Sequence, residues 1–340
     1  MEFKGFTYGY DGSHGDYRSP EGIASQNLLY KTGVNWICLA VVAMQETPIS
    51  TDIEFSFGQT PTDRDIQAFV ERAHDNSVSV CLKPMVNCKD GTWRARIAFP
   101  DMGEGEEDLY WNAWFKSYSD FMIYYAELAE DTGCEMLCIG CEMCGTEKKE
   151  EHWRKLISEI RKVYSGKLIY NTNHGHEDAV KWFDAVDYLG TSAYFPVAEF
   201  REAKSIDTGI SNEACVEEYL ELVEEMKSNW QRISNEMEAF SRKWGKKIVF
   251  IEIGCRSARG CASMPWDFSH RNLPIDQDEQ AAFYDSCLSV FSNKEWFGGM
   301  FWWDWSTFIY DDQTTADSDI GFNIHLKKAE NVLKEWYAKL

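Results

Sequence analysis

Short apolar runs alternate with amphipathic helical segments along the whole chain. A continuous apolar run such as Val34–Val42 is typical of a strand that is buried on both faces, and Met136–Gly140 has the same character. Pro61–Asp75 instead has helical spacing, with an apolar stripe on one face. We expect Thr60 to cap this helix and Pro61 to take its first position.

The same pattern predicts eight strands. They span Gly5–Asp11, Val34–Val42, Val78–Met85, Met136–Gly140, Lys167–Asn171, Val186–Tyr194, Lys247–Gly254 and Gly298–Trp303. Helical patterns separate them, including a short helix over Glu177–Phe183. Alternating strands and helices predict an all-parallel sheet, and eight such units close into a barrel. With no linker-like stretch, residues 1–340 are expected to form one (β/α)8 barrel domain. An open doubly wound sheet is the alternative, but no glycine-rich phosphate turn follows the first strand.

Charge and cysteine usage restrict the possible binding partners and the cellular compartment of the protein. The chain has 34 Lys and Arg against 56 Asp and Glu, and its net charge of −22 argues against nucleic acid or an anionic membrane as partner. No apolar stretch is long enough to span a membrane, and the first residues show no secretion signal. The 11 cysteines are an odd number, and several lie in apolar runs, which favours free thiols in a reducing compartment. We therefore expect a cytoplasmic protein.

Two glutamates are the strongest candidates for chemistry. In a barrel of this kind, catalytic groups lie where strands end, and Glu142 and Glu252 each follow apolar residues of the fourth and seventh strands. A carboxylate there is costly to bury unless it is paired or used. Across the barrel mouth, the two groups can lie roughly 5–5.5 Å apart, the spacing of a retaining glycosidase. The alternative is that each glutamate forms a structural ion pair.

Aromatic residues are abundant, with 14 Trp, and several fall at strand ends or in the loops that follow. Trp303 offers a flat apolar floor for a sugar ring, and Trp93 a platform for a neighbouring sugar. Tyr194 could hydrogen-bond the nucleophile, and Tyr8, in the second half of the first strand, is a candidate contact to the substrate. Lys83 is either a donor to sugar hydroxyls or an ion-pair partner of a barrel carboxylate. Barrel packing is the alternative role for the aromatic residues.

These residues lie in segments whose order resembles glycoside hydrolase family 113, the β-1,4-mannanases. The matching segments are Lys4–Gly9, Leu82–Asp90 with Trp93, Ile139–Glu142, Asp187–Pro196, Val249–Ser257 with Pro265 and Trp266, and Gly299–Trp305. The resemblance implies Glu142 as acid/base and Glu252 as nucleophile of a retaining mechanism. It also implies that Lys83, Asn173, Tyr194 and Trp303 contact the reacting sugar.

The resemblance further implies an oligosaccharide substrate of the β-1,4-linked mannan type or a related one, and no cofactor. Short oligosaccharides are the expected substrates of a cytoplasmic enzyme. One position departs from the pattern of the wider group of retaining barrel enzymes, many of which place Asn before the acid/base to bind the sugar 2-hydroxyl. Here that residue is Cys141, so the contact is lost or supplied by another side chain.

Two metal-binding patterns and a non-catalytic role are the competing interpretations. Cys134, Cys138 and Cys141, with Cys144 beyond them, have a spacing that can ligate an iron–sulfur cluster, although Cys138 lies within a predicted strand. The sequence His174-Gly175-His176 can bind zinc if other strands supply further ligands. A non-catalytic carbohydrate-binding barrel would keep the tryptophan platforms without needing both glutamates. We expect no metal or cluster to be required.

Overall fold

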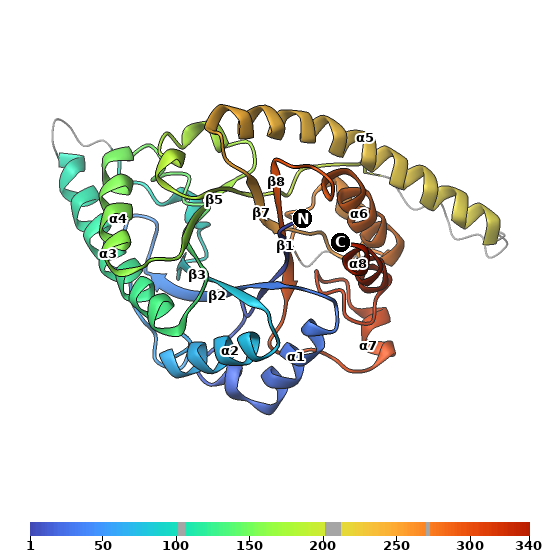
Figure 1. The fold of residues 1–340 in the computed structure, drawn as a ribbon, viewed down its shortest axis with the longest axis horizontal. Helices are drawn as coiled ribbons and strands as arrows, with labels where there is room; N and C mark the ends of the chain where they lie inside the picture. The colour runs from blue at the N-terminus through green and yellow to red at the C-terminus, as the bar shows by residue number, and fades with distance from the viewer. Residues whose placement is uncertain (101–105, 201–211, 270–272) are drawn as a thin grey trace.

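The computed structural model describes residues 1–100, 106–200, 212–269 and 273–340. Eight parallel strands pair in chain order, and the last pairs with the first to close a barrel (Figure 1). They are β1 (Phe3–Tyr8), β2 (Trp36–Gln45), β3 (Ser79–Cys88), β4 (Met136–Cys141), β5 (Lys167–Asn173), β6 (Tyr188–Ser192), β7 (Ile248–Ile253) and β8 (Phe297–Trp305). The predicted (β/α)8 barrel is therefore confirmed.

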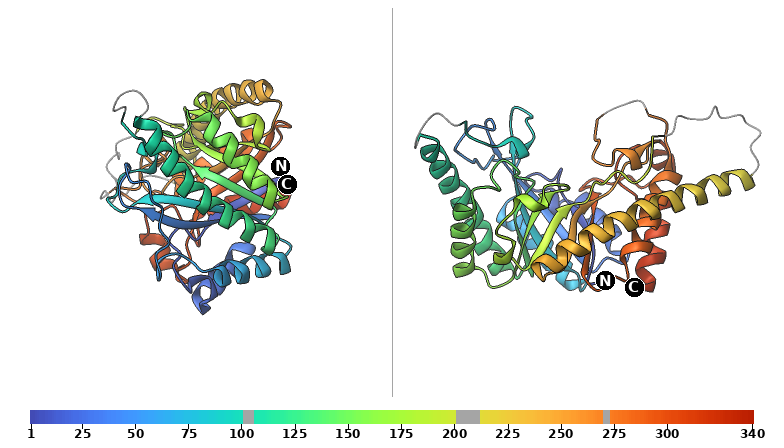
Figure 2. Two further views of the ribbon diagram at one scale, coloured as in Figure 1. Left: turned by 90° about the vertical axis from the view of Figure 1, so that its left-hand side faces the viewer. Right: turned by 90° about the horizontal axis from the view of Figure 1, so that it is seen from above.

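Helices surround the barrel, as the views in Figure 2 show. They are α1 (Pro20–Tyr30), α2 (Asp63–Asp75), α3 (Glu106–Thr132), α4 (Glu150–Val163), α5 (Asn212–Trp244), α6 (Gln277–Phe291), α7 (Gln313–Ser318) and α8 (Lys328–Lys339). The N-terminal part of α5 extends past α6 and away from the barrel, while the two chain termini lie side by side. None of the described helices is long and apolar enough to cross a bilayer.

Two local predictions need correction. The helix over 61–75 begins at Asp63, and its cap is Thr62 rather than Thr60. The Thr62 hydroxyl accepts from the Asp65 amide while the Asp65 carboxylate accepts from the Thr62 amide, which satisfies two free donors at once. Between β5 and β6, two short 3₁₀ turns, Glu177–Ala179 and Phe183–Ala185, replace the predicted helix, and the buried side chains of this segment hold it in place. Trp182 stacks on Trp153, whereas Phe183 packs against Phe240 of α5.

The interior of the barrel is packed rather than open. Its lower level is apolar and holds small and large side chains: Phe3, Cys38, Cys81, Met136, Cys138, Ile169, Val249, Ile251 and Phe301. At the next level, Ala40 lies beside Lys83 and Cys141 beside Asn171 in the strand register. Lys83 and Asn171 therefore enter the barrel above a largely apolar level, toward the carboxyl ends of the strands.

Candidate active site

Both predicted catalytic glutamates follow a β-bulge, which changes the direction of side chains. In β7, Phe250 packs outward against the helices and Ile251 packs inward, so simple alternation would turn Glu252 outward. The strand holds one extra residue relative to both neighbours at this point, and Glu252 reaches polar groups inside the barrel instead. The strand β4 has the same irregularity just before Glu142.

Glu252 is surrounded by hydrogen-bond donors on both of its carboxylate oxygens. Lys83, which is fully buried, forms an ion pair with Oε1. Asn171 Nδ2 donates to the same oxygen at 3.3 Å, and the Cys141 thiol donates to it at 3.2 Å. The Tyr194 hydroxyl donates to Oε2 at 3.2 Å, the contact that the sequence predicts. Each of these donors favours the ionised carboxylate.

These contacts decide the charge state of Glu252. Burial alone would raise the pKa of this carboxyl group, because a buried charge loses its hydration. The positive charges of Lys83 and Arg94, together with the hydrogen bonds to this group, outweigh burial and hold the pKa of Glu252 below its usual value. Hydrogen bonds from Lys83 and Cys141 act in the same direction. The carboxylate is thus prepared to act as a nucleophile.

Glu142 lies beyond the end of β4 in an uncommon backbone conformation. Its φ of 52° is in the left-handed region, which costs a non-glycine residue conformational energy, and its amide donates to the Asn171 carbonyl at 2.6 Å. Trp93 Nε1 donates to Oε2 of Glu142 at 3.1 Å. The Arg94 guanidinium lies 3.7 Å from the same oxygen. Both contacts come from the loop after β3.

The environment of Glu142 favours the protonated form. Burial raises the pKa of this carboxyl group, and the nearby negative charge of Glu252 raises it further. Arg94 and the Trp93 hydrogen bond lower the pKa but do not reverse the shift. The site therefore holds one carboxyl group biased toward the acid and another biased toward the carboxylate. Two carboxyl groups with opposite shifts are the requirement for acid and nucleophile in glycoside hydrolysis.

Three other predicted site residues gather around this pair. Trp303 is partly exposed, with Lys83 Nζ 5.9 Å from its ring centroid and the Tyr10 ring edge-on at 4.8 Å. Of the two roles considered for Lys83, the structure gives the ion pair with a barrel carboxylate. Trp93 is 45% exposed and uses its indole N–H on Glu142, so its free face remains available to a ligand.

Two predicted site residues are not brought to the pair. Tyr8 is fully buried, packs against Phe69 between barrel and helices, and donates its hydroxyl to the Gly22 carbonyl. We therefore correct its assignment: the alternation of β1 turns Tyr8 away from the mouth. Asn173 ends β5, and its amide donates to the His174 carbonyl at 3.4 Å rather than to either glutamate.

The sequence did not identify Asn171 and Arg94 as contacts of the pair. Asn171 lies two positions before Asn173 on the same face of β5, and a sequence cannot show which of the two reaches the carboxylate. Arg94 is buried in the loop after β3, where its Nη1 donates to Asn87 Oδ1 at 2.9 Å. A lone arginine in a polar loop normally points to solvent, and only its place beside Trp93 could have marked it.

The iron–sulfur interpretation does not fit the described cysteines. Cys138 packs in the lower level inside the barrel, while Cys134 packs outside it. Cys141 contacts Glu252 at the upper level. Side chains that point to different layers cannot ligate one cluster, so this spacing reflects strand packing.

Comparisons with known proteins identify the family of the chain. The model of glycoside hydrolase family 113 matches residues 6–327. A solved structure described as a family 113 β-1,4-mannanase complex is 33% identical, covers 100% of both chains and has a TM-score of 0.86. The β-mannanase AaManA from Alicyclobacillus acidocaldarius, solved in complex with ManMIm, is 34% identical over 99% of this chain and 97% of its own, with a TM-score of 0.85.

More distant structures share the fold alone. A β-glucuronidase from Ruminococcus gnavus is 12% identical with a TM-score of 0.61, and the match covers 50% of that chain. Among curated proteins, none matches. The family model spans nearly the whole chain, and the two mannanase structures match it from end to end. The protein therefore belongs to glycoside hydrolase family 113.

Proposed function

We propose that this glycoside hydrolase cleaves short β-1,4-linked manno-oligosaccharides with retention of configuration, using Glu142 as acid/base and Glu252 as nucleophile. The observation that carries the proposal is the opposite pKa shift of two buried carboxyl groups in one site. The mannan-type substrate is supported by the relatives of equal length, which are described as β-1,4-mannanases.

In the first step, a Glu252 oxygen attacks the anomeric carbon while Glu142 gives its proton to the glycosidic oxygen. The bond between the anomeric carbon and the leaving sugar breaks, and a glycosyl ester of Glu252 forms. Lys83 and Tyr194 hold the attacking carboxylate in place and keep it ionised. Trp303 supplies the apolar face under the reacting sugar ring.

In the second step, the ionised Glu142 takes a proton from water, and the oxygen of that water attacks the anomeric carbon. The ester bond breaks, Glu252 leaves as a carboxylate, and the product has its original β configuration. The change in role follows from the charges, because ester formation removes the negative charge of Glu252 that raises the pKa of Glu142. Glu142 is therefore a stronger acid in the intermediate and can act as a base.

Asn171 is our candidate for the contact to the sugar 2-hydroxyl that Cys141 cannot make. Its amide nitrogen lies 3.3 Å from the Cys141 sulfur and 3.3 Å from Oε1 of Glu252. Its Oδ1 accepts from the Ser192 hydroxyl at 3.2 Å, which fixes the orientation of the amide. A sugar whose anomeric carbon faces Glu252 would bring its C2 substituent close to this group.

We also propose that the protein works in a reducing compartment such as the cytoplasm. The support is that the ten cysteines whose side chains the structure describes are free and that nine of them are buried.

Product analysis tests the function. The purified protein is incubated with manno-oligosaccharides of increasing length and, separately, with aryl β-mannoside, β-glucoside, β-galactoside and β-xyloside. We expect cleavage of the manno-oligosaccharides and highest kcat/KM on the mannoside. Preference for another aryl glycoside, with intact manno-oligosaccharides, would contradict the substrate class. No hydrolysis in the whole panel would favour a non-catalytic carbohydrate-binding barrel.

A further inference from the structure

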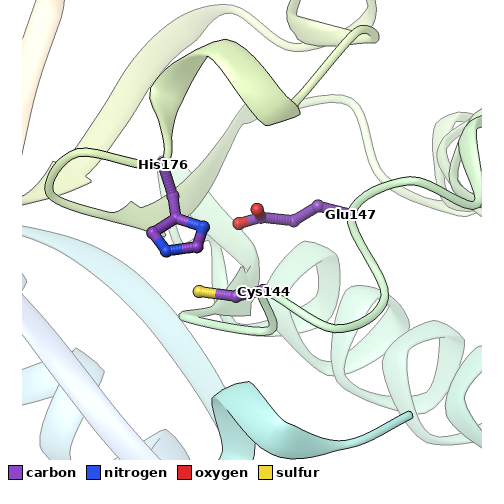
Figure 3. A group of neighbouring side chains, drawn as sticks. All are labelled: Cys144, Glu147 and His176. Atoms are coloured by element: carbon purple, nitrogen blue, oxygen red, sulfur yellow. The ribbon is translucent and has the colours of Figure 1, made fainter.

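A cysteine, a glutamate and a histidine meet beside the active site without a role in the proposed mechanism. Cys144 and Glu147 lie in the loop between β4 and α4, and His176 lies in the loop after β5. Their ligand atoms all lie within 4.8 Å of one another, and Figure 3 shows the three side chains pointing to a common centre. Cys144 comes from the cysteine pattern of the sequence and His176 from the His-Gly-His pattern, whereas Glu147 belongs to neither.

Glu147 is the feature that points to a cation site. Its side chain is fully buried, and its Oε1 accepts from Tyr170 at 2.9 Å and from Thr172 at 2.7 Å. The second oxygen, Oε2, is also buried but has no hydrogen-bond partner among the described residues. A buried polar atom without a partner is uncommon in folded proteins, and a bound cation would satisfy this oxygen.

The loop around these ligands is held in place independently of any metal. Trp182 Nε1 donates to the Glu147 carbonyl at 3.1 Å, and Trp153 Nε1 donates to the Thr146 carbonyl at 3.1 Å. The two indoles stack on each other at 4.7 Å. The hydrogen bonds from Tyr170 and Thr172 orient the carboxylate in the way that outer residues orient the ligands of metal sites.

The set of donor atoms selects the class of metal. A thiolate, an imidazole and a carboxylate together suit zinc and similar borderline ions, whereas magnesium and calcium prefer oxygen ligands. Three protein ligands leave a fourth position for water, and His176 is exposed, so an ion can enter from solvent. Zinc bonds are about 2.0–2.3 Å long, so the ligands need to move closer by about 1 Å, which the exposed His176 side chain allows.

We propose that Cys144, Glu147 and His176 form a zinc-binding site that ties the loop carrying Glu142 to the loop after β5. The site lies outside the reacting pair and supplies no step of the hydrolysis.

Cobalt(II) substitution tests the site directly, because a thiolate ligand gives a charge-transfer band in the near ultraviolet. Tag-free protein is stripped with a chelator and titrated with Co²⁺, and Zn²⁺ is then added in competition. We expect one equivalent of Co²⁺ to bind with a thiolate band that Zn²⁺ abolishes. Cys144→Ser should lose the band, and His176→Gln should weaken binding at least about tenfold.

The controls are matched by residue type and position. His174→Gln changes the neighbouring histidine, which stacks on Trp266, and Cys134→Ser changes a cysteine of the same segment. Both variants should bind Co²⁺ like the unaltered protein. Absence of a thiolate band in the unaltered protein, or an undiminished band in Cys144→Ser, would overturn the proposal. If Cys144→Ser fails to fold, His176→Gln still tests the site, because His176 is exposed and its substitution should leave the fold intact.

Discussion

At Glu142, neighbours act on one carboxyl group in opposite directions. Burial and the charge of Glu252 favour the proton, while Arg94 and the Trp93 hydrogen bond favour its loss. At Glu252, the cations and hydrogen-bond donors together outweigh burial and favour the charged form. Single substitutions around the pair should therefore shift one limb of the pH profile of kcat/KM: the acid limb reports the nucleophile and the alkaline limb reports the acid.

Trp93→Phe is expected to move the alkaline limb to higher pH. The indole N–H stabilises the ionised form of Glu142, so its removal raises the pKa of this group, and the acid stays protonated to higher pH. The measurement is the pH dependence of kcat/KM on a manno-oligosaccharide. Trp266→Phe is the control, since Trp266 stacks on His174 and should leave the limb unmoved. An alkaline limb that stays in place or moves down in Trp93→Phe would contradict this account.

Lys83→Met is expected to move the acid limb to higher pH. Loss of the positive charge raises the pKa of Glu252, so the nucleophile is protonated, and activity is lost, at a higher pH than before. Breaking a buried ion pair should also lower the free energy of unfolding by about 3–5 kcal/mol. Lys89→Met removes a surface charge and should leave the free energy of unfolding close to that of the unaltered protein. Chemical denaturation and pH profiles of both variants check these outcomes.

Asn171→Ala tests the contact to the 2-hydroxyl. We expect kcat/KM on an aryl β-mannoside to fall about 10²–10³-fold, because contacts to this hydroxyl strengthen in the transition state and supply several kcal/mol. On the matching 2-deoxy substrate, the variant and the unaltered protein should differ much less. Equal losses on both substrates would mean that Asn171 acts only through its hydrogen bond to Glu252.

At the level of single elements, bulges in two strands position the catalytic glutamates, while helix caps contribute to the stability of the surrounding helices. One extra residue in β7 turns Glu252 into the barrel, and the corresponding bulge in β4 precedes Glu142. On the outside, α2 begins at a capping box formed by Thr62 and Asp65. Changes at such a cap should affect stability without affecting the chemistry.

Thr62→Ala should lower the free energy of unfolding by about 1–2 kcal/mol, because the Asp65 amide loses its side-chain acceptor and the Asp65 carboxylate loses the Thr62 hydroxyl as a donor. Activity at moderate temperature should be unchanged, since α2 lies outside the barrel. Thr62→Ser keeps the hydroxyl and serves as the control, with stability close to that of the unaltered protein. If both substitutions destabilise equally, the hydroxyl group does not explain the cap.

Over the whole molecule, the alternation of apolar runs with helical patterns was enough to predict the barrel and to place the two glutamates at strand ends. Apolar runs mark buried parallel strands wherever they occur, and a carboxylate directly after such a run is conspicuous. The direction of individual side chains was harder to predict. Strict alternation fails at the bulges of β4 and β7. In β1 alternation holds, and it turns Tyr8 toward the helices and away from the site. The role of Arg94 could not be predicted, because its burial depends on tertiary contacts that no local pattern encodes.

The assignment of roles within the pair is the central claim, and azide rescue of two variants tests it most directly. Both Glu142→Ala and Glu252→Ala are given an aryl β-mannoside with a good leaving group and added azide, and the anomeric configuration of the glycosyl azide is read by NMR. Without the acid/base, Glu252 still forms the intermediate, so Glu142→Ala should give the β-azide. Without the nucleophile, azide attacks directly, so Glu252→Ala should give the α-azide. The reverse pattern would mean that the two roles are exchanged, and full hydrolytic activity in either variant would contradict the mechanism itself.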